Sequence, residues 1–170
     1  MEFKLEKAQI FNIDGIMQCI RDAQKYLANL GVDQWQDGYP EEEVISKDIN
    51  DNNAFVIMDE KRVAAYSMFS TEGDNSYNVI KGKWLTNSDE YGVIHRMAVN
   101  AKYRGTGCAF YFFKEFEQKL AYSNIKSMRI DTHRDNRAMQ NLLQRLNYEY
   151  CGIIQLERGG ERLAYEKLID

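Results

Sequence analysis

The clearest alternation of hydrophobic and polar positions lies near the middle of the chain. Residues 93–99 alternate apolar and polar side chains well enough to predict a strand, and residues 100–103 predict a short polar turn. Farther along, apolar residues recur at helical spacing and predict a helix with one buried face. That face consists of Phe112, Phe113, Phe116 and Leu120. Two glycines, Gly105 and Gly107, therefore stand where a strand turns into a helix.

Upstream, the pattern predicts a strand at residues 3–8 and then a helix at residues 16–30. Gly31 suits the C-terminal cap of that helix, because glycine readily adopts a left-handed conformation. A loop at residues 31–40 ends in the only proline of the chain, which can occupy the first turn of a second helix reaching about Asn50.

The remaining segments read as strands, apart from a helix whose apolar stripe is Met139, Leu142, Leu143 and Leu146. The strands are predicted at residues 54–58, 63–69, 76–84, 128–132, 148–155 and 162–167. No repeat, low-complexity tract or linker interrupts this order. The sequence therefore predicts one α/β domain spanning residues 1–170.

Composition narrows the class of protein. The net charge of −4 and the pI of about 5.3 argue against nucleic acid as the main partner and are compatible with a cationic, amine-bearing substrate. No apolar run approaches the ~20 residues of a membrane span, and the first residues lack the features of a signal peptide, so we expect no membrane partner and a cytoplasmic protein. Three scattered cysteines, Cys19, Cys108 and Cys151, predict reduced, buried thiols and no metal site.

The glycine turn indicates a phosphate ligand. The first N–H groups of a helix have no partner within the helix, and the helix dipole adds partial positive charge there. Glycines let a pyrophosphate approach those amides, and Arg104 adds a full charge beside them. The turn lacks both the Gly-Lys-Ser/Thr ending of nucleoside triphosphate loops and the Gly-x-Gly-x-x-Gly of dinucleotide sites. An ordinary glycine turn without a ligand is the alternative.

The sequence does resemble a known family here. Arg104, Gly107 and Ala109, read as Arg-x-x-Gly-x-Ala after a strand, are similar to motif A of the GCN5-related N-acetyltransferases (GNAT), which bind acetyl-CoA. Leu146-Asn147-Tyr148 is similar to the Leu-Gly-Phe of that family. The order of elements agrees along the whole chain, most specifically between Ile94 and Gly152.

The resemblance implies an α/β (α+β) fold with a mixed, mostly antiparallel central sheet of six to seven strands flanked by about four helices. It also implies transfer of the acetyl group of acetyl-CoA to a primary amine of a small molecule or peptide, by direct attack in a ternary complex. It implies no metal, and it leaves a homodimer open.

The resemblance also implies the residues that bind the coenzyme. Backbone groups of Met97, Ala98 and Val99 would bind the pantetheine arm, and the Met97 N–H would stabilise the oxyanion. The pyrophosphate would contact Arg104 and the amides of Gly105, Thr106, Gly107, Cys108 and Ala109. Asn136 matches an asparagine that commonly contacts the coenzyme, although an ordinary helix N-cap explains it equally well.

The candidate catalytic and acceptor-binding residues each have two interpretations. His95 could take the proton of the amine, directly or through water, or could be a structural histidine. Trp35 and Tyr39 either line the acceptor pocket or anchor their loop to the core. The family tyrosine that protonates the departing thiolate corresponds to Leu143 here, so the general acid is unassigned, with Tyr148 and Tyr111 as candidates.

Two rival functions stay open from sequence. A non-catalytic acyl-CoA-binding or sensor module fits the missing tyrosine. His95 and the loop at residues 31–40 with Trp35 and Tyr39, called the aromatic loop below, favour an enzyme. An aminoglycoside-modifying enzyme would keep the chemistry and require an acidic acceptor cleft. The acidic residues are too dispersed along the chain to decide this point.

Overall fold

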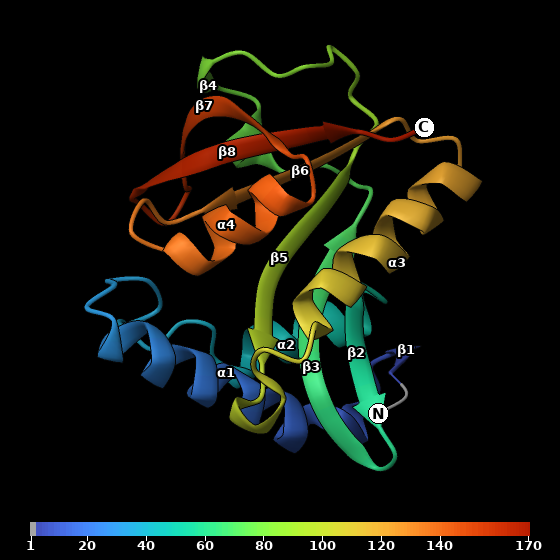
Figure 1. The fold of residues 1–170 in the computed structure, drawn as a ribbon, viewed down its shortest axis with the longest axis vertical. Coiled ribbons are helices and arrows are strands. Elements are labelled where there is room, and N and C mark those ends of the chain that lie inside the picture. The colour runs from blue at the N-terminus through green and yellow to red at the C-terminus, as the bar shows by residue number, and fades with distance from the viewer. Residues whose placement is uncertain (1–2) are drawn as a thin grey trace. The chain divides into compact units, whose positions relative to one another are not determined.

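The computed structural model describes residues 3–170; Met1 and Glu2, the start of the segment assessed for a signal peptide, lie outside the described residues. The α-helices are α1 (Ile13–Asn29), α2 (Glu42–Asn50), α3 (Cys108–Tyr122) and α4 (Arg137–Arg145). Short 3-10 helices occur at η1 (Ile10–Asn12), η2 (Asn75–Tyr77) and η3 (Ala101–Tyr103). The strands are β1 (Lys4–Lys7), β2 (Ala54–Asp59), β3 (Arg62–Ser70), β4 (Ile80–Gly82), β5 (Gly92–Val99), β6 (Ser127–Thr132), β7 (Glu149–Gln155) and β8 (Glu161–Leu168) (Figure 1).

The strands form one mixed sheet in the order β1-β2-β3-β5-β6-β8-β7-β4. Most of its pairs are antiparallel, while β5 and β6 are parallel. This confirms the predicted α+β class and the four helices. The sheet has eight strands, one in each segment where the hydrophobic pattern predicts a strand, against the six to seven that the family resemblance implies. The segment predicted as a strand at residues 76–84 contains η2 and only the three-residue β4, which pairs with β7.

The chain divides into two compact units. The first contains residues up to Phe69 together with His95–Glu115, and the second contains Ser70–Ile94 together with Phe116–Asp170. The single domain inferred from the sequence therefore stays a prediction, and each unit is described by itself.

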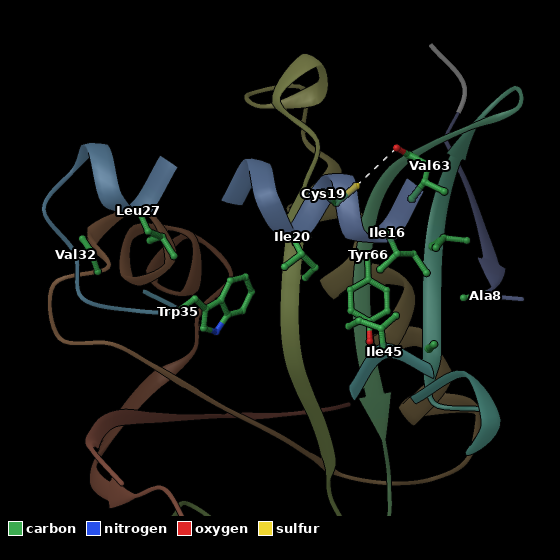
Figure 2. Packing of buried hydrophobic residues seen from close by; sticks show 13 residues of the cluster. Ala8, Ile16, Cys19, Ile20, Leu27, Val32, Trp35, Ile45, Val63 and Tyr66 are labelled. Atoms are coloured by element: carbon green, nitrogen blue, oxygen red, sulfur yellow. Dashed lines mark hydrogen bonds between the residues drawn. The ribbon is translucent and has the colours of Figure 1, made fainter. Parts of the chain in front are cut away.

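The core of the first unit lies between α1, α2 and the β2–β3 hairpin (Figure 2). Ile16, Cys19 and Ile20 of α1 repeat at helical spacing and are fully buried. The Cys19 thiol donates a hydrogen bond to the Val63 carbonyl over 3.7 Å, and burial raises the pKa of that thiol to about 12. As predicted, the helix stops at Gly31, which adopts a φ of 69°.

The second unit contains the long β7–β8 hairpin with β6 beside it (Figure 1). A buried ion pair joins Arg129 Nε of β6 to Glu166 Oε1 of β8 at 3.2 Å, and the Arg129 guanidinium stacks on the rings of Trp84 and Tyr91. Burial opposes ionisation of Glu166, but hydrogen bonds from Ser127 and Thr86 and the charge of Arg129 lower its pKa. The pair thereby fastens the loop at residues 84–91 to the sheet.

The fold also bears on the cysteines and on membrane-spanning helices. Cys19, Cys108 and Cys151 are buried and free, as expected from their spacing. No helix among residues 3–170 is long and apolar enough to cross a membrane.

Candidate active site

Strand β5 contains a residue in the left-handed conformation, Arg96, with a φ of 54°. A non-glycine residue rarely adopts this conformation inside a strand, where it interrupts the regular pleat as β-bulges do. The parallel ladder of β5 with β6 comprises Gly92 and Val93, which precede this point. Simple alternation therefore does not determine whether the side chains of His95 and Met97, on either side of Arg96, share a face of the strand.

The side chain of Arg96 is held by a carboxylate of α2. Nε of Arg96 donates to Oδ2 of Asp48 over 2.8 Å, and Nη2 donates to Oδ1 over 2.7 Å. The side chains of Arg96 and Asp48 are only 14% and 8% exposed. A bidentate pair of this kind fixes the position and the plane of the guanidinium.

Two tyrosines complete this cluster. The Tyr66 hydroxyl of β3 donates to Asp48 Oδ2 over 2.5 Å, and the Tyr39 hydroxyl accepts a hydrogen bond from Arg96 Nη1 over 2.9 Å. Burial, followed by the nearby Asp48 carboxylate, raises the pKa of Tyr66 well above its usual value, so Tyr66 stays a neutral donor. Burial also disfavours the charged Arg96, but Tyr39 and Asp48 outweigh it and keep the pKa of Arg96 above its ordinary range.

The predicted phosphate turn lies between η3 and α3. Gly105 and Gly107 adopt φ angles of 79° and 95°, and a Cβ atom built on either would meet no heavy atom within 4 Å. The turn is therefore open above both glycines. Among the described residues, no acceptor is found for the amide N–H groups of Gly105, Gly107, Ala109 and Phe110.

Hydrogen bonds within the turn and to α1 hold this open turn in place. Thr106 Oγ1 donates to the Tyr103 carbonyl over 2.6 Å, and the Ala101 amide donates to Asp22 Oδ2 over 2.8 Å. Arg104 lies over the ring of Tyr26 at 4.1 Å, and its Nη2 donates to the Asp22 carbonyl over 3.2 Å. These contacts tie the Arg104 side chain to α1, while the free amides and the helix dipole at the start of α3 favour an anion. The turn therefore suits an anionic ligand.

The aromatic loop is tied to the same unit. Trp35, with a φ of 63°, is 9% exposed and belongs to the core cluster with Leu27 and Val32 (Figure 2). The Tyr39 carbonyl accepts a hydrogen bond from Gln24 Nε2 over 3.0 Å. Trp35 thus anchors the loop, whereas Tyr39 also reaches the Arg96 cluster. A role of either residue in binding the acceptor stays a prediction.

The remaining predicted residues have plainer settings. His95 is half-buried, and its carbonyl accepts a hydrogen bond from Ser67 Oγ over 3.4 Å. In the second unit, Asn136 caps α4, because its Oδ1 accepts a hydrogen bond from the Met139 amide over 3.1 Å. Leu143 is fully buried, and burial raises the pKa of the Tyr148 hydroxyl well above its usual value.

Sequence reasoning missed the Asp48–Arg96 pair. The signal available was weak: Asp48 stands on the apolar stripe of a short helix beside Ile45 and Ile49, and Arg96 lies next to His95 in the middle of the predicted strand. A charge on an apolar stripe indicates a buried partner, but it does not identify that partner.

Comparison with known proteins defines the class first. The crystal structure of a GNAT-family acetyltransferase from Streptococcus agalactiae matches 99% of this chain and 96% of its own, with 34% identity and a TM-score of 0.89. The PaiA N-acetyltransferase from Thermoplasma acidophilum, solved in complex with coenzyme A, matches 99% of both chains with 13% identity and a TM-score of 0.72. The ribosomal-protein-S18-alanine N-acetyltransferase of Escherichia coli matches 99% of this chain and 95% of its own, with 11% identity and a TM-score of 0.68. At such low identity, the last two show the fold alone.

The sequence comparison then gives the family. A sequence profile of the acetyltransferase (GNAT) family matches residues 20–148. No significant match was found among curated proteins. The chain belongs to the GNAT family of acetyltransferases, as its motif A resemblance predicted.

Proposed function

We propose that this enzyme transfers the acetyl group of acetyl-CoA to a primary amine of a small molecule or peptide, by direct attack in a ternary complex. The observation that carries the proposal is the open glycine turn at the start of α3. Four of its amides, those of Gly105, Gly107, Ala109 and Phe110, have no acceptor among residues 3–170, and Arg104 precedes this stretch directly. This arrangement suits a pyrophosphate.

Coenzyme binding is assigned to two neighbouring stretches of the chain. The amides of Gly105 to Ala109 and the Arg104 guanidinium take the pyrophosphate, and the backbone of Met97, Ala98 and Val99 takes the pantetheine arm. One contact of Arg104 to a backbone carbonyl leaves further N–H groups for the phosphate oxygens. Asn136 is a further candidate ligand, because a capping side chain can still contact a coenzyme.

The reaction itself requires little covalent chemistry from the protein. The amine nitrogen attacks the thioester carbonyl, a C–N bond forms, the C–S bond breaks, and the amine gives up one proton. An N–H aimed at the developing oxyanion contributes about 3 kcal/mol, and we assign that role to Met97. A thiol with a pKa of ~8.5 can leave as a thiolate, so Leu143 in the tyrosine position does not prevent turnover.

His95 is the proposed base. A free alkylamine titrates near ~10 and is mostly charged at neutral pH, so removing its proton accelerates the attack. The acceptor is proposed to be an amine because the chain belongs to the GNAT family, and the motif A resemblance implies transfer to a primary amine. Tyr39 and Trp35 are proposed to line its pocket.

Thiol release tests this proposal. The purified protein is incubated with acetyl-CoA and a panel of polyamines, amino acids and short peptides, and free thiol is measured alongside mass spectrometry of the amines. We expect thiol release that depends on one class of amine and equals the acetylated amine formed. Saturable coenzyme binding without thiol release for any amine would instead favour the non-catalytic sensor.

A further inference from the structure

The backbone of Arg96 controls the direction of a proposed catalytic group. The peptide plane between Arg96 and Met97 carries the Met97 N–H, and the dihedral angles of Arg96 orient that plane. A left-handed residue turns the plane away from the direction found in a regular strand. An L-residue with a side chain pays free energy for this conformation, so the surrounding structure must hold it.

The side chain of Arg96 makes the contacts that hold its own backbone in this conformation. Asp48 accepts two hydrogen bonds from the Arg96 guanidinium, and its Oδ2 accepts another from the Tyr66 hydroxyl. The Tyr39 hydroxyl accepts a third hydrogen bond from Arg96. We infer that Asp48, Tyr66 and Arg96 form a clamp that holds the left-handed backbone of Arg96 in β5 and thereby aims the Met97 N–H at the thioester. In this inference, which rests on the proposed function, Arg96 and Asp48 are positioning residues.

Stability alone is a poor explanation of the clamp. A buried ion pair is expensive to desolvate, and apolar side chains of similar size often stabilise a protein as well or better. A left-handed position is also least costly with glycine, yet the chain has arginine there. Glycine would allow both the left-handed and the regular conformation, whereas the bidentate pair favours one of them.

The clamp also reaches the aromatic loop. The Tyr39 hydroxyl accepts a hydrogen bond from the Arg96 guanidinium, and Gln24 Nε2 donates one to the Tyr39 carbonyl. Substitution of Tyr39 by phenylalanine removes the hydroxyl that accepts from Arg96 and leaves the pair of Arg96 with Asp48 in place.

Two double variants separate the backbone effect from loss of the pair. One variant combines Asp48→Asn with Arg96→Gly, and the other combines Asp48→Asn with Arg96→Ala. Both lack the ion pair, and they differ by one methyl group. A left-handed alanine is disfavoured by about 1–2 kcal/mol, which corresponds to a difference of about 5- to 30-fold. With saturating amine and saturating acetyl-CoA, we expect kcat to be lower in the alanine variant by that factor.

The outcomes are distinguishable. Equal kcat values in the two double variants would overturn the clamp, because a merely structural pair is lost equally in both. Crystal structures of both variants report the conformation without reference to activity: we expect a positive φ at residue 96 with glycine and a negative φ with alanine. A positive φ with alanine would also overturn the inference, whereas absence of turnover in the unsubstituted enzyme would contradict the proposed function.

Discussion

Replacement of Gly107 by glutamate is expected to abolish acetyl-CoA binding. The site has open space above the glycine, so a longer side chain can enter it without a clash inside the protein. The carboxylate would then occupy the space assigned to the pyrophosphate and would repel it. Each charge-assisted hydrogen bond contributes about 1.5–3 kcal/mol, so loss of two or more weakens binding by more than about 100-fold. Calorimetric titration with acetyl-CoA measures the effect.

Gly159→Glu is the matched control for this variant. Gly159 has a φ of 94°, against 95° for Gly107, and no heavy atom lies within 4 Å of a Cβ built there. Both variants therefore carry the same charge change and a similar backbone strain, but Gly159 belongs to the turn between β7 and β8. We expect unchanged affinity for Gly159→Glu. Unchanged affinity for Gly107→Glu would refute the phosphate assignment.

Replacement of His95 by alanine is expected to have the second-largest effect. General base catalysis contributes typically about 10²- to 10⁴-fold, so kcat/KM should fall by that order near neutral pH. The loss should shrink above about pH 8, because the neutral fraction of an amine titrating near ~10 increases with pH and the need for a base decreases. The pH profile of kcat/KM with the best amine measures this dependence.

His133 provides the control, since it is the only other histidine in the chain. Its Nδ1 accepts a hydrogen bond from the Asp135 amide over 3.1 Å, which indicates a role in the local turn. We expect His133→Ala to retain the pH profile of the unsubstituted enzyme. A uniform, small loss for His95→Ala at every pH would mean that His95 contributes packing and no proton transfer.

Much of the fold is visible in the sequence because its signals are local. The stripe at Phe112, Phe113 and Phe116 predicts α3, and the two glycines before it predict where the helix begins. Asn147 stands where the family motif has glycine, and it adopts a left-handed φ of 63°, which asparagine tolerates after a helix. Strand β4 escaped a clear prediction because its three residues are too few to show an alternation.

The site is only partly visible in the sequence. The glycine turn is one continuous stretch, so its residues and its chemistry could be proposed together. The clamp is different because Asp48 and Arg96 are far apart in sequence, and only the packing of α2 on the sheet brings them into contact. The left-handed conformation of Arg96 is equally hidden, since no glycine or asparagine marks it.

Titration of the unsubstituted protein with acetyl-CoA and with acetyl-pantetheine measures whether the glycine turn binds the coenzyme pyrophosphate. Acetyl-pantetheine carries the same thioester but lacks the pyrophosphate and the nucleotide. If the amides between Gly105 and Phe110 bind the pyrophosphate, acetyl-CoA should bind saturably and acetyl-pantetheine at least about tenfold more weakly. Equal affinities, or no saturable binding of acetyl-CoA, would contradict the account.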